Sequence, residues 1–129
     1  MDAKVFDELV AKRIGKCIGI LCEKAEGYAA PEDRLHNFKV AAALQGITPR
    51  EAIRGMMAKH TVSVYDMCKT DAVYPDAVWD EKLTDSINYL LLLEAIIQDE
   101  NAEKCEAEMQ RIVSDVEAYV EEIKKEKGL

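Results

Sequence analysis

The chain has 129 residues, of which 49% are hydrophobic and 33% are charged. This composition is enough for one domain with its own core and excludes disorder as the default state. The formal net charge of -8 and the isoelectric point near 4.8 argue against a nucleic-acid-binding protein, because such proteins need a basic face to replace counterions.

Cysteine and hydropathy patterns indicate a cytoplasmic protein. The four cysteines form no CxxC pair, and with two histidines in the chain no zinc-site spacing appears. The N-terminus lacks the features of a signal peptide. The apolar run over 90–97 is interrupted by Glu94 and is much shorter than the roughly 20 residues that span a bilayer. We therefore expect a soluble, cytoplasmic protein with reduced thiols and no membrane or nucleic-acid partner.

Helical spacing of apolar residues dominates the chain, and the alternation typical of strands is absent. The pattern predicts an all-α domain over 1–129, a bundle of about five helices near 3–26, 32–45, 49–68, 77–99 and 101–127. Gly46 is a typical C-terminal stop. The TPRE segment at 48–51 is typical of a helix start, with Thr48 as cap and Pro49 in the first helical position. A weak break is expected around 99–101.

The fifth predicted helix, over 101–127, carries a heptad pattern. Its apolar residues follow one another at steps of 4, 3, 4, 3 and 4 positions: Cys105, Met109, Ile112, Val116, Tyr119 and Ile123. Such a seam packs either on the bundle or on a partner chain. Because the fourth helix is also apolar nearly all round in its second half, we expect a homo-oligomer, either a dimer or a dimer-based tetramer.

Polar residues interrupt the apolar pattern at three places. Glu23 and Glu26 lie three residues apart at the end of the first helix, and a second line holds Lys59, Ser63 and Asp66 beside His60. The third line, at i, i+4 and i+7, consists of Glu81, Asp85 and Asn88. Solvated surface, a salt-bridged outer face and a hydrogen-bonded histidine are the ordinary alternatives. They explain Asn88 least well, because four leucines follow it closely.

Carboxylates on facing helices suit Mg²⁺ or Mn²⁺, hard cations that prefer oxygen ligands. The candidate metal ligands, which are also the candidate catalytic residues, are Glu23, Glu26, Glu81 and Asp85. We expect Glu26 and Asp85 to approach each other closely enough to share one cation. A bound polyphosphate would then need positive or polar neighbours, and the candidate substrate-binding residues are Lys24, Lys59, His60, Lys82 and Asn88.

Two sets of motifs carry a family resemblance. The ExxE ending the first helix and the later E-K-L-x-D-x-x-N-Y-L-L-L-L resemble the all-α nucleotide pyrophosphatases, the MazG-like group. The segments DRLHNFKVAAALQG, GMMAKHTVSVYDM and EKLTDSINYLLLLEA resemble small phage- and prophage-borne proteins near that group. This second resemblance covers roughly 22–97.

The resemblance implies a Mg²⁺-dependent hydrolysis, in which a nucleoside triphosphate is cut to a monophosphate and pyrophosphate. In that family the EExxE and ExxD motifs supply the metal ligands. Glu23, Glu26 and Asp85 match motif positions, whereas Cys22 and Lys82 replace motif glutamates and Glu81 precedes the second motif. The implied function is that of a nucleoside triphosphate pyrophosphohydrolase-like protein. Two alternatives stay open: a phage-encoded protein that sequesters a signalling nucleotide without cutting it, and a structural helical oligomer.

Overall fold

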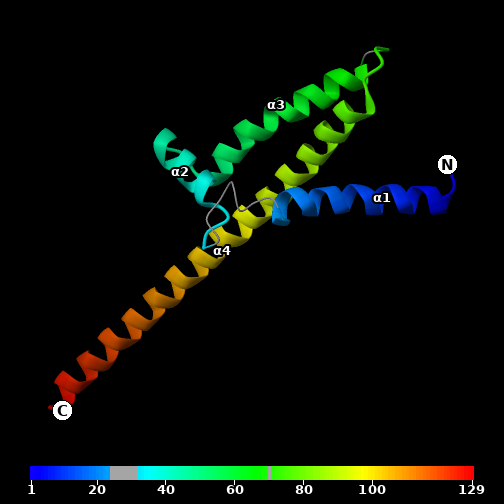
Figure 1. Ribbon diagram of the computed structural model, residues 1–129. Helices are drawn as coiled ribbons and strands as arrows, with labels where there is room; N and C mark the ends of the chain where they lie inside the picture. Colours follow the sequence, from blue (N-terminus) through cyan, green and yellow to red (C-terminus); the bar gives the residue numbers. More distant parts are fainter. Residues whose placement is uncertain (24–31, 70) are drawn as a thin grey trace. The chain divides into compact units, whose positions relative to one another are not determined.

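The computed structural model describes residues 1–23, 32–69 and 71–129, and these residues form helices and connecting segments without any strand (Figure 1). The elements in chain order are α1 (Ala3–Ile18), the π-helical turn η1 (Gly19–Glu23), α2 (His36–Gln45), α3 (Pro49–Lys69) and α4 (Asp76–Lys127). The predicted all-α class is therefore confirmed. Within the described residues no helix is long and apolar enough to cross a membrane.

The C-terminal half of the chain differs from the prediction. The sequence predicts a break around 99–101, but α4 runs without interruption through 52 residues, so the described chain has four α-helices rather than about five. The expected break rests on Asp99, Glu100 and Asn101. These residues cost less than about 0.7 kcal/mol each in a helix interior, and only glycine or proline interrupts a helix strongly.

The chain divides into two compact units, 1–96 and 97–129. The first unit contains α1, η1, α2, α3 and the beginning of α4, and it holds all the buried residues of the described ranges. The second unit is the remaining part of α4.

Helix ends in the first unit follow from local chemistry. Asp2 accepts a hydrogen bond from the Val5 amide at 2.9 Å and caps α1. Gly46 ends α2 with φ +66, a left-handed conformation that glycine adopts without steric cost. Thr48 then accepts a hydrogen bond from the Glu51 amide at 3.2 Å, and Pro49 is the first residue of α3. The structure thus has the stop and the start that the sequence predicts.

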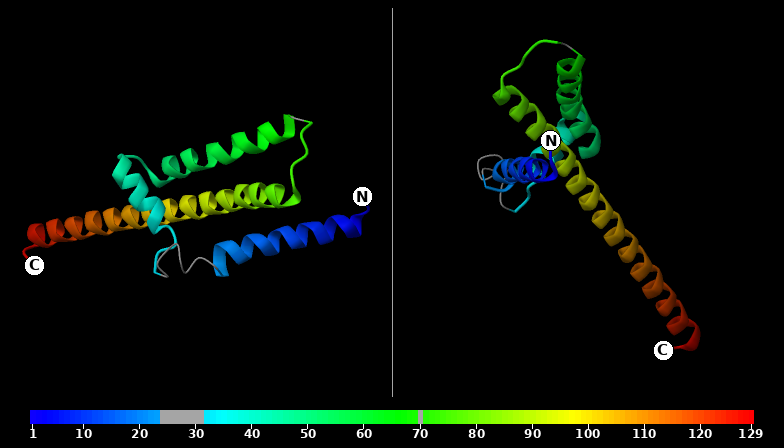
Figure 2. Two further views of the ribbon diagram at one scale, coloured as in Figure 1. Left: turned by 45° about the horizontal axis from the view of Figure 1, so that its top comes forward. Right: turned by 90° about the vertical axis from the view of Figure 1, so that its right-hand side faces the viewer.

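The core of the first unit lies where α3 runs back along the beginning of α4, as Figure 2 shows. Leu35, Ile53 and Ile96 are its buried centre, and partly buried side chains surround them: Phe38, Met57, Tyr89, Leu92 and Leu93. Ile53 and Ile96 are 0% and 1% exposed. This packing fixes the face of α4 that carries Asn88 and Tyr89 against α3.

Candidate functional site

Three polar or aromatic side chains meet between α3 and α4. Nδ1 of His60 lies 3.8 Å from Oδ2 of Asp85, and the ring centroids of His60 and Tyr89 are 4.9 Å apart. The His60 nitrogen is buried and has no hydrogen-bond partner among the described residues, because 3.8 Å exceeds hydrogen-bonding distance. The arrangement leaves a donor or acceptor position open between the imidazole and the carboxylate.

Asn88, one turn beyond Asp85 on α4, is the most unusual residue of the first unit. Its side chain is 5% exposed, and neither its amide nitrogen nor its amide oxygen has a hydrogen-bond partner in the described part of the chain. A buried amide without partners costs about 1–3 kcal/mol of stability. Such a group in a protein that folds calls for an explanation, and a ligand is one.

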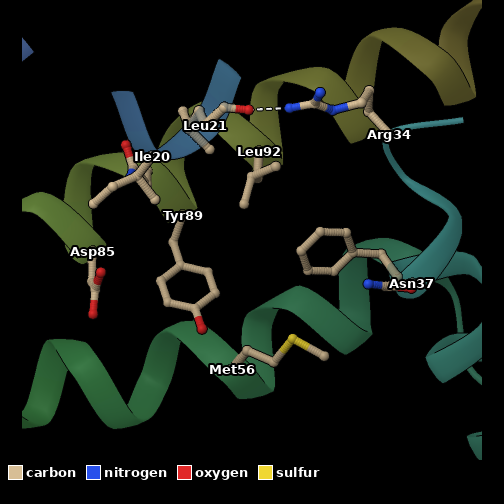
Figure 3. Close-up of a pocket in the computed structure, with 10 residues that line it drawn as sticks. Ile20, Leu21, Arg34, Asn37, Met56, Asp85, Tyr89 and Leu92 are labelled. Carbon is tan, nitrogen blue, oxygen red and sulfur yellow. Dashed lines mark hydrogen bonds between the residues drawn. The ribbon is translucent and has the colours of Figure 1, made fainter. Parts of the chain in front are cut away.

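Asn88 lines a cavity of about 420 Å³, called here the aromatic cavity. Its walls come from η1, the segment before α2, α2, α3 and α4, and they consist of Ile20, Leu21, Arg34, Asn37, Phe38, Met56, Asp85, Asn88, Tyr89 and Leu92. Tyr89 extends from α4 toward α3 near Met56 (Figure 3). An apolar cavity of this size with few polar groups is typical of a small-molecule site.

Arg34 connects the segment before α2 to η1 at the edge of the aromatic cavity. Its guanidinium donates a hydrogen bond to the backbone carbonyl of Leu21 in the π-helical turn, drawn in Figure 3. Nearby, Asp33 accepts hydrogen bonds from the Lys39 ammonium at 3.0 Å and from the Leu35 amide at 2.9 Å. These two contacts, the Lys39 contact foremost, lower the pKa of Asp33. The start of α2 is thereby held beside η1. Single π-helical turns inside helical segments are frequent at functional sites.

A second cavity of about 400 Å³, called here the acidic cavity, adjoins the first. It is lined by Lys16, Gly19, Ile20, Asp80, Glu81, Thr84 and Asp85. Ile20 and Asp85 belong to the walls of both cavities. The two cavities therefore adjoin each other at Ile20 and Asp85.

A cluster of ion pairs attaches α1 to α4 at the acidic cavity. Nη2 of Arg13 lies 2.6 Å from Oδ1 of Asp80, and Nη1 of Arg13 donates to Oγ1 of the buried Thr84 at 2.8 Å. The ammonium of Lys16 donates to the other carboxylate oxygen of Asp80. The hydrogen bonds from Lys16 and then from Arg13 lower the pKa of Asp80 to about 2. Asp80 lines the acidic cavity like Glu81 and Asp85, but its carboxylate is engaged in ion pairs with α1.

The structure brings together four of the predicted site residues. Asp85 and Asn88 line the aromatic cavity, His60 contacts Asp85, and Glu81 and Asp85 line the acidic cavity. His60 lies on α3, and the other three lie on α4.

Other predicted site residues lie elsewhere. Lys59 is exposed and Lys82 is half-buried, and neither lines the aromatic or the acidic cavity. Lys24 and Glu26 lie outside the described residues, as does the expected approach of Glu26 to Asp85. For Glu23 the structure describes the backbone, as the last residue of η1.

Sequence reasoning misses several residues of this region. In the sequence Tyr89 and Phe38 are ordinary apolar positions, although both line the aromatic cavity. Arg13 and Lys16 are three residues apart on one side of α1, but nothing in the sequence indicates that both pair with Asp80.

The described side chains fit a magnesium ion only in part. Among them no group of three or more His, Cys, Asp or Glu is arranged to hold a metal. Glu81 and Asp85 provide two carboxylates one helical turn apart at the acidic cavity. Two carboxylates together with the phosphates of a substrate are a common way to hold Mg²⁺. These residues therefore suit a cation that arrives with a polyphosphate.

Comparisons of the chain with protein-family models, with curated proteins and with solved structures found no match. The resemblance to the MazG-like pyrophosphatases therefore stays a prediction from the motifs. The basis for a functional proposal is the geometry of the two cavities.

Proposed function

We propose that this protein binds a nucleotide, with the base in the aromatic cavity and the phosphates at the acidic cavity. The observation that carries the proposal is the buried Asn88 amide, whose donor and acceptor are both without a partner in the described residues at the wall of an apolar cavity. Nucleobases present a donor and an acceptor side by side on one edge, and an amide pairs with such an edge through two hydrogen bonds.

Two further features support a nucleobase at this place. Phe38 and Tyr89 offer aromatic faces, on which bases stack with about 1–3 kcal/mol each. The adjoining acidic cavity offers Glu81 and Asp85 for a magnesium ion that binds together with the phosphates. His60 lies beside Asp85, with its Nδ1 3.8 Å from Oδ2 of Asp85, and this nitrogen has no hydrogen-bond partner in the described residues.

The test is titration calorimetry with nucleosides, nucleoside monophosphates and nucleoside triphosphates, each with and without Mg²⁺. We expect binding by at least one base and tighter binding of its triphosphate when Mg²⁺ is present. Replacing Asn88 with leucine should weaken binding at least ten-fold, about 1.4 kcal/mol. Asn101→Leu, at an exposed position on α4, is the matched control and should leave binding unchanged. Equal affinity in both variants contradicts the proposal.

Hydrolysis of a nucleoside triphosphate to a monophosphate and pyrophosphate is the second candidate function. It is favoured by the position of Glu81, which lines the acidic cavity beside Asp85, whereas Lys82 lines neither cavity. The position of Glu81 supports it as a metal ligand in place of the motif glutamate that Lys82 replaces. A bound magnesium ion would supply charge neutralisation and an activated water.

Pyrophosphate release measured across a panel of nucleoside triphosphates separates turnover from binding. Release that disappears in Glu81→Ala and in Asp85→Ala, but not in Glu94→Ala, supports an enzyme. Binding without release supports a protein that sequesters its nucleotide. If neither signal appears with the common nucleotides, the third alternative, a structural helical oligomer, is favoured.

We also propose that the protein is a homo-oligomer. The support comes from apolar side chains on α1 that are 40–55% exposed: Val5, Phe6, Leu9, Val10, Ile14 and Ile18. An exposed apolar stripe of this length marks an interaction surface. Light scattering at micromolar concentration should give a multiple of the chain mass, and a monomer contradicts the proposal.

A further inference from the structure

The second unit, residues 97–129, presents an apolar stripe along one side of α4. Large side chains over two heptads are 42–63% exposed: Met109, Ile112, Val113, Val116, Tyr119 and Val120. Helices in water obtain most of their stability from packing an apolar face rather than from intrinsic propensity. A stripe of this kind therefore needs a covering partner.

We infer that this part of α4 forms a parallel coiled coil with the same segment of a second copy, with the two Cys105 side chains facing each other. The inference rests on the proposed homo-oligomer and specifies which surface joins the two copies and in which direction their helices run. The inference does not depend on nucleotide binding. In the heptad register, Met109, Val116 and Ile123 take position a, and Cys105, Ile112 and Tyr119 take position d. Val113 and Val120 at position e widen the apolar stripe.

The charges beside the seam decide against an antiparallel pair. Position g is acidic in three successive heptads, at Glu108, Asp115 and Glu122. In an antiparallel pair whose a and d layers are aligned, each g residue of one helix faces a g residue of the other helix. Glu108 of each copy would then face Glu122 of the other, and the two Asp115 side chains would face each other. Each of these like-charge pairs is repulsive.

A parallel pair removes these repulsions, because g of one helix faces e of the next heptad in the other. Glu108 then lies beside Val113 of the second copy and Asp115 beside Val120. Glu122 lies beside Lys127 and forms an ion pair in each direction. The antiparallel pair would recover the same number of ion pairs, between Asp99 and Lys127. The like-charge pairs are therefore the difference between the two orientations, and they favour the parallel one.

The test uses the full chain with the exposed Cys22 and Cys68 changed to serine and the buried Cys17 retained. Mild oxidation should link two chains through Cys105, because a disulfide requires Cα atoms about 4.4–6.8 Å apart, as within one d layer. We expect the covalent dimer as the main product, and no dimer after Cys105→Ser. Val116→Lys, in the seam, should lower its yield at least ten-fold. Ser114→Lys, on the opposite face at position f, should leave the yield unchanged.

A mixing experiment tests the orientation. A chain with Cys105 is mixed with a tagged chain carrying Cys105→Ser and Ile123→Cys, since Cys105 and position 123 face each other only in the antiparallel pair. A mixed disulfide as the main product overturns the inference. An oligomer by light scattering that gives neither disulfide also overturns it, while the proposed homo-oligomer stands on another surface. A monomer without disulfides overturns both.

Discussion

Arg13 on α1 and Asp80 on α4 form an ion pair across 67 positions of sequence, with Nη2 of Arg13 2.6 Å from Oδ1 of Asp80. The same guanidinium also donates to the backbone carbonyl of Asp80 at 3.0 Å. Together with Lys16, this contact joins α1 to the face of α4 that carries Glu81 and Asp85. The acidic cavity exists because α1 is held there.

The first prediction concerns pH. The pKa of Asp80 is lowered from 3.8 to about 2 in the folded protein by Lys16 and Arg13. A lowered folded pKa means that the unfolded chain takes up the proton first as pH falls. The contribution of Asp80 to stability is therefore complete above about pH 4 and is lost as pH falls toward 2. We expect Asp80→Asn to lower the urea midpoint at pH 7 and to have a smaller effect at pH 3.

The control for that experiment is Glu81→Gln, a neutralisation of the neighbouring exposed carboxylate. It should leave the urea midpoint nearly unchanged at both values of pH. An Asp80→Asn effect that does not shrink between pH 7 and pH 3 would show that the carboxylate acts through something other than its charge.

The second prediction concerns Thr84, which is 3% exposed and accepts the 2.8 Å hydrogen bond from Arg13. Thr84→Val keeps the shape and removes the acceptor, so we expect the free energy of unfolding to fall by about 1.5 kcal/mol, the low end for a bond to a charged group. Ser86→Ala is the control, because the Ser86 hydroxyl donates to the Lys82 carbonyl within α4. It should cost less. Equal losses in urea denaturation would contradict a specific role for the Arg13 contact.

The third prediction separates ligand binding from folding at Asn88. Because both amide atoms are buried without partners in the described residues, Asn88→Leu should raise the free energy of unfolding by about 1–3 kcal/mol while it weakens nucleotide binding at least ten-fold. Stability gained together with function lost is the signature of a residue kept for its ligand. Thermal unfolding of the ligand-free variant gives the answer. Destabilisation would mean that the amide serves the fold.

The fourth prediction concerns the core between α3 and α4. Ile53 is fully buried, and Ile53→Ala should cost about 2–5 kcal/mol because it leaves a cavity beside Leu35 and Ile96. Val62→Ala removes apolar atoms from the same helix at a position that is 58% exposed, and it should cost under about 0.5 kcal/mol. Urea denaturation of the two variants compares them directly. Similar costs would indicate that Ile53 does not lie in the core between α3 and α4.

The sequence by itself determined the helical class, the end of α2, the start of α3, and the line that holds Glu81, Asp85 and Asn88. These features depend on residues within one or two turns of each other: a left-handed glycine at Gly46, a cap at Thr48, and the helical period of 3.6. Local chemistry is sufficient for all of them. It is not sufficient at 99–101, where weak helix formers suggest a break that α4 does not have.

Only the tertiary structure decided which residues meet. His60 reaches Asp85 and Tyr89 because the packing of Ile53 against Ile96 sets how α3 lies along α4. Arg13 on α1 pairs with Asp80 on α4, although the two residues are 67 positions apart in the sequence. Neither contact can be predicted from residue spacing, because side-chain packing rather than periodicity sets how the helices approach each other. The burial of Asn88 without partners, on which the proposed function rests, is a consequence of that packing.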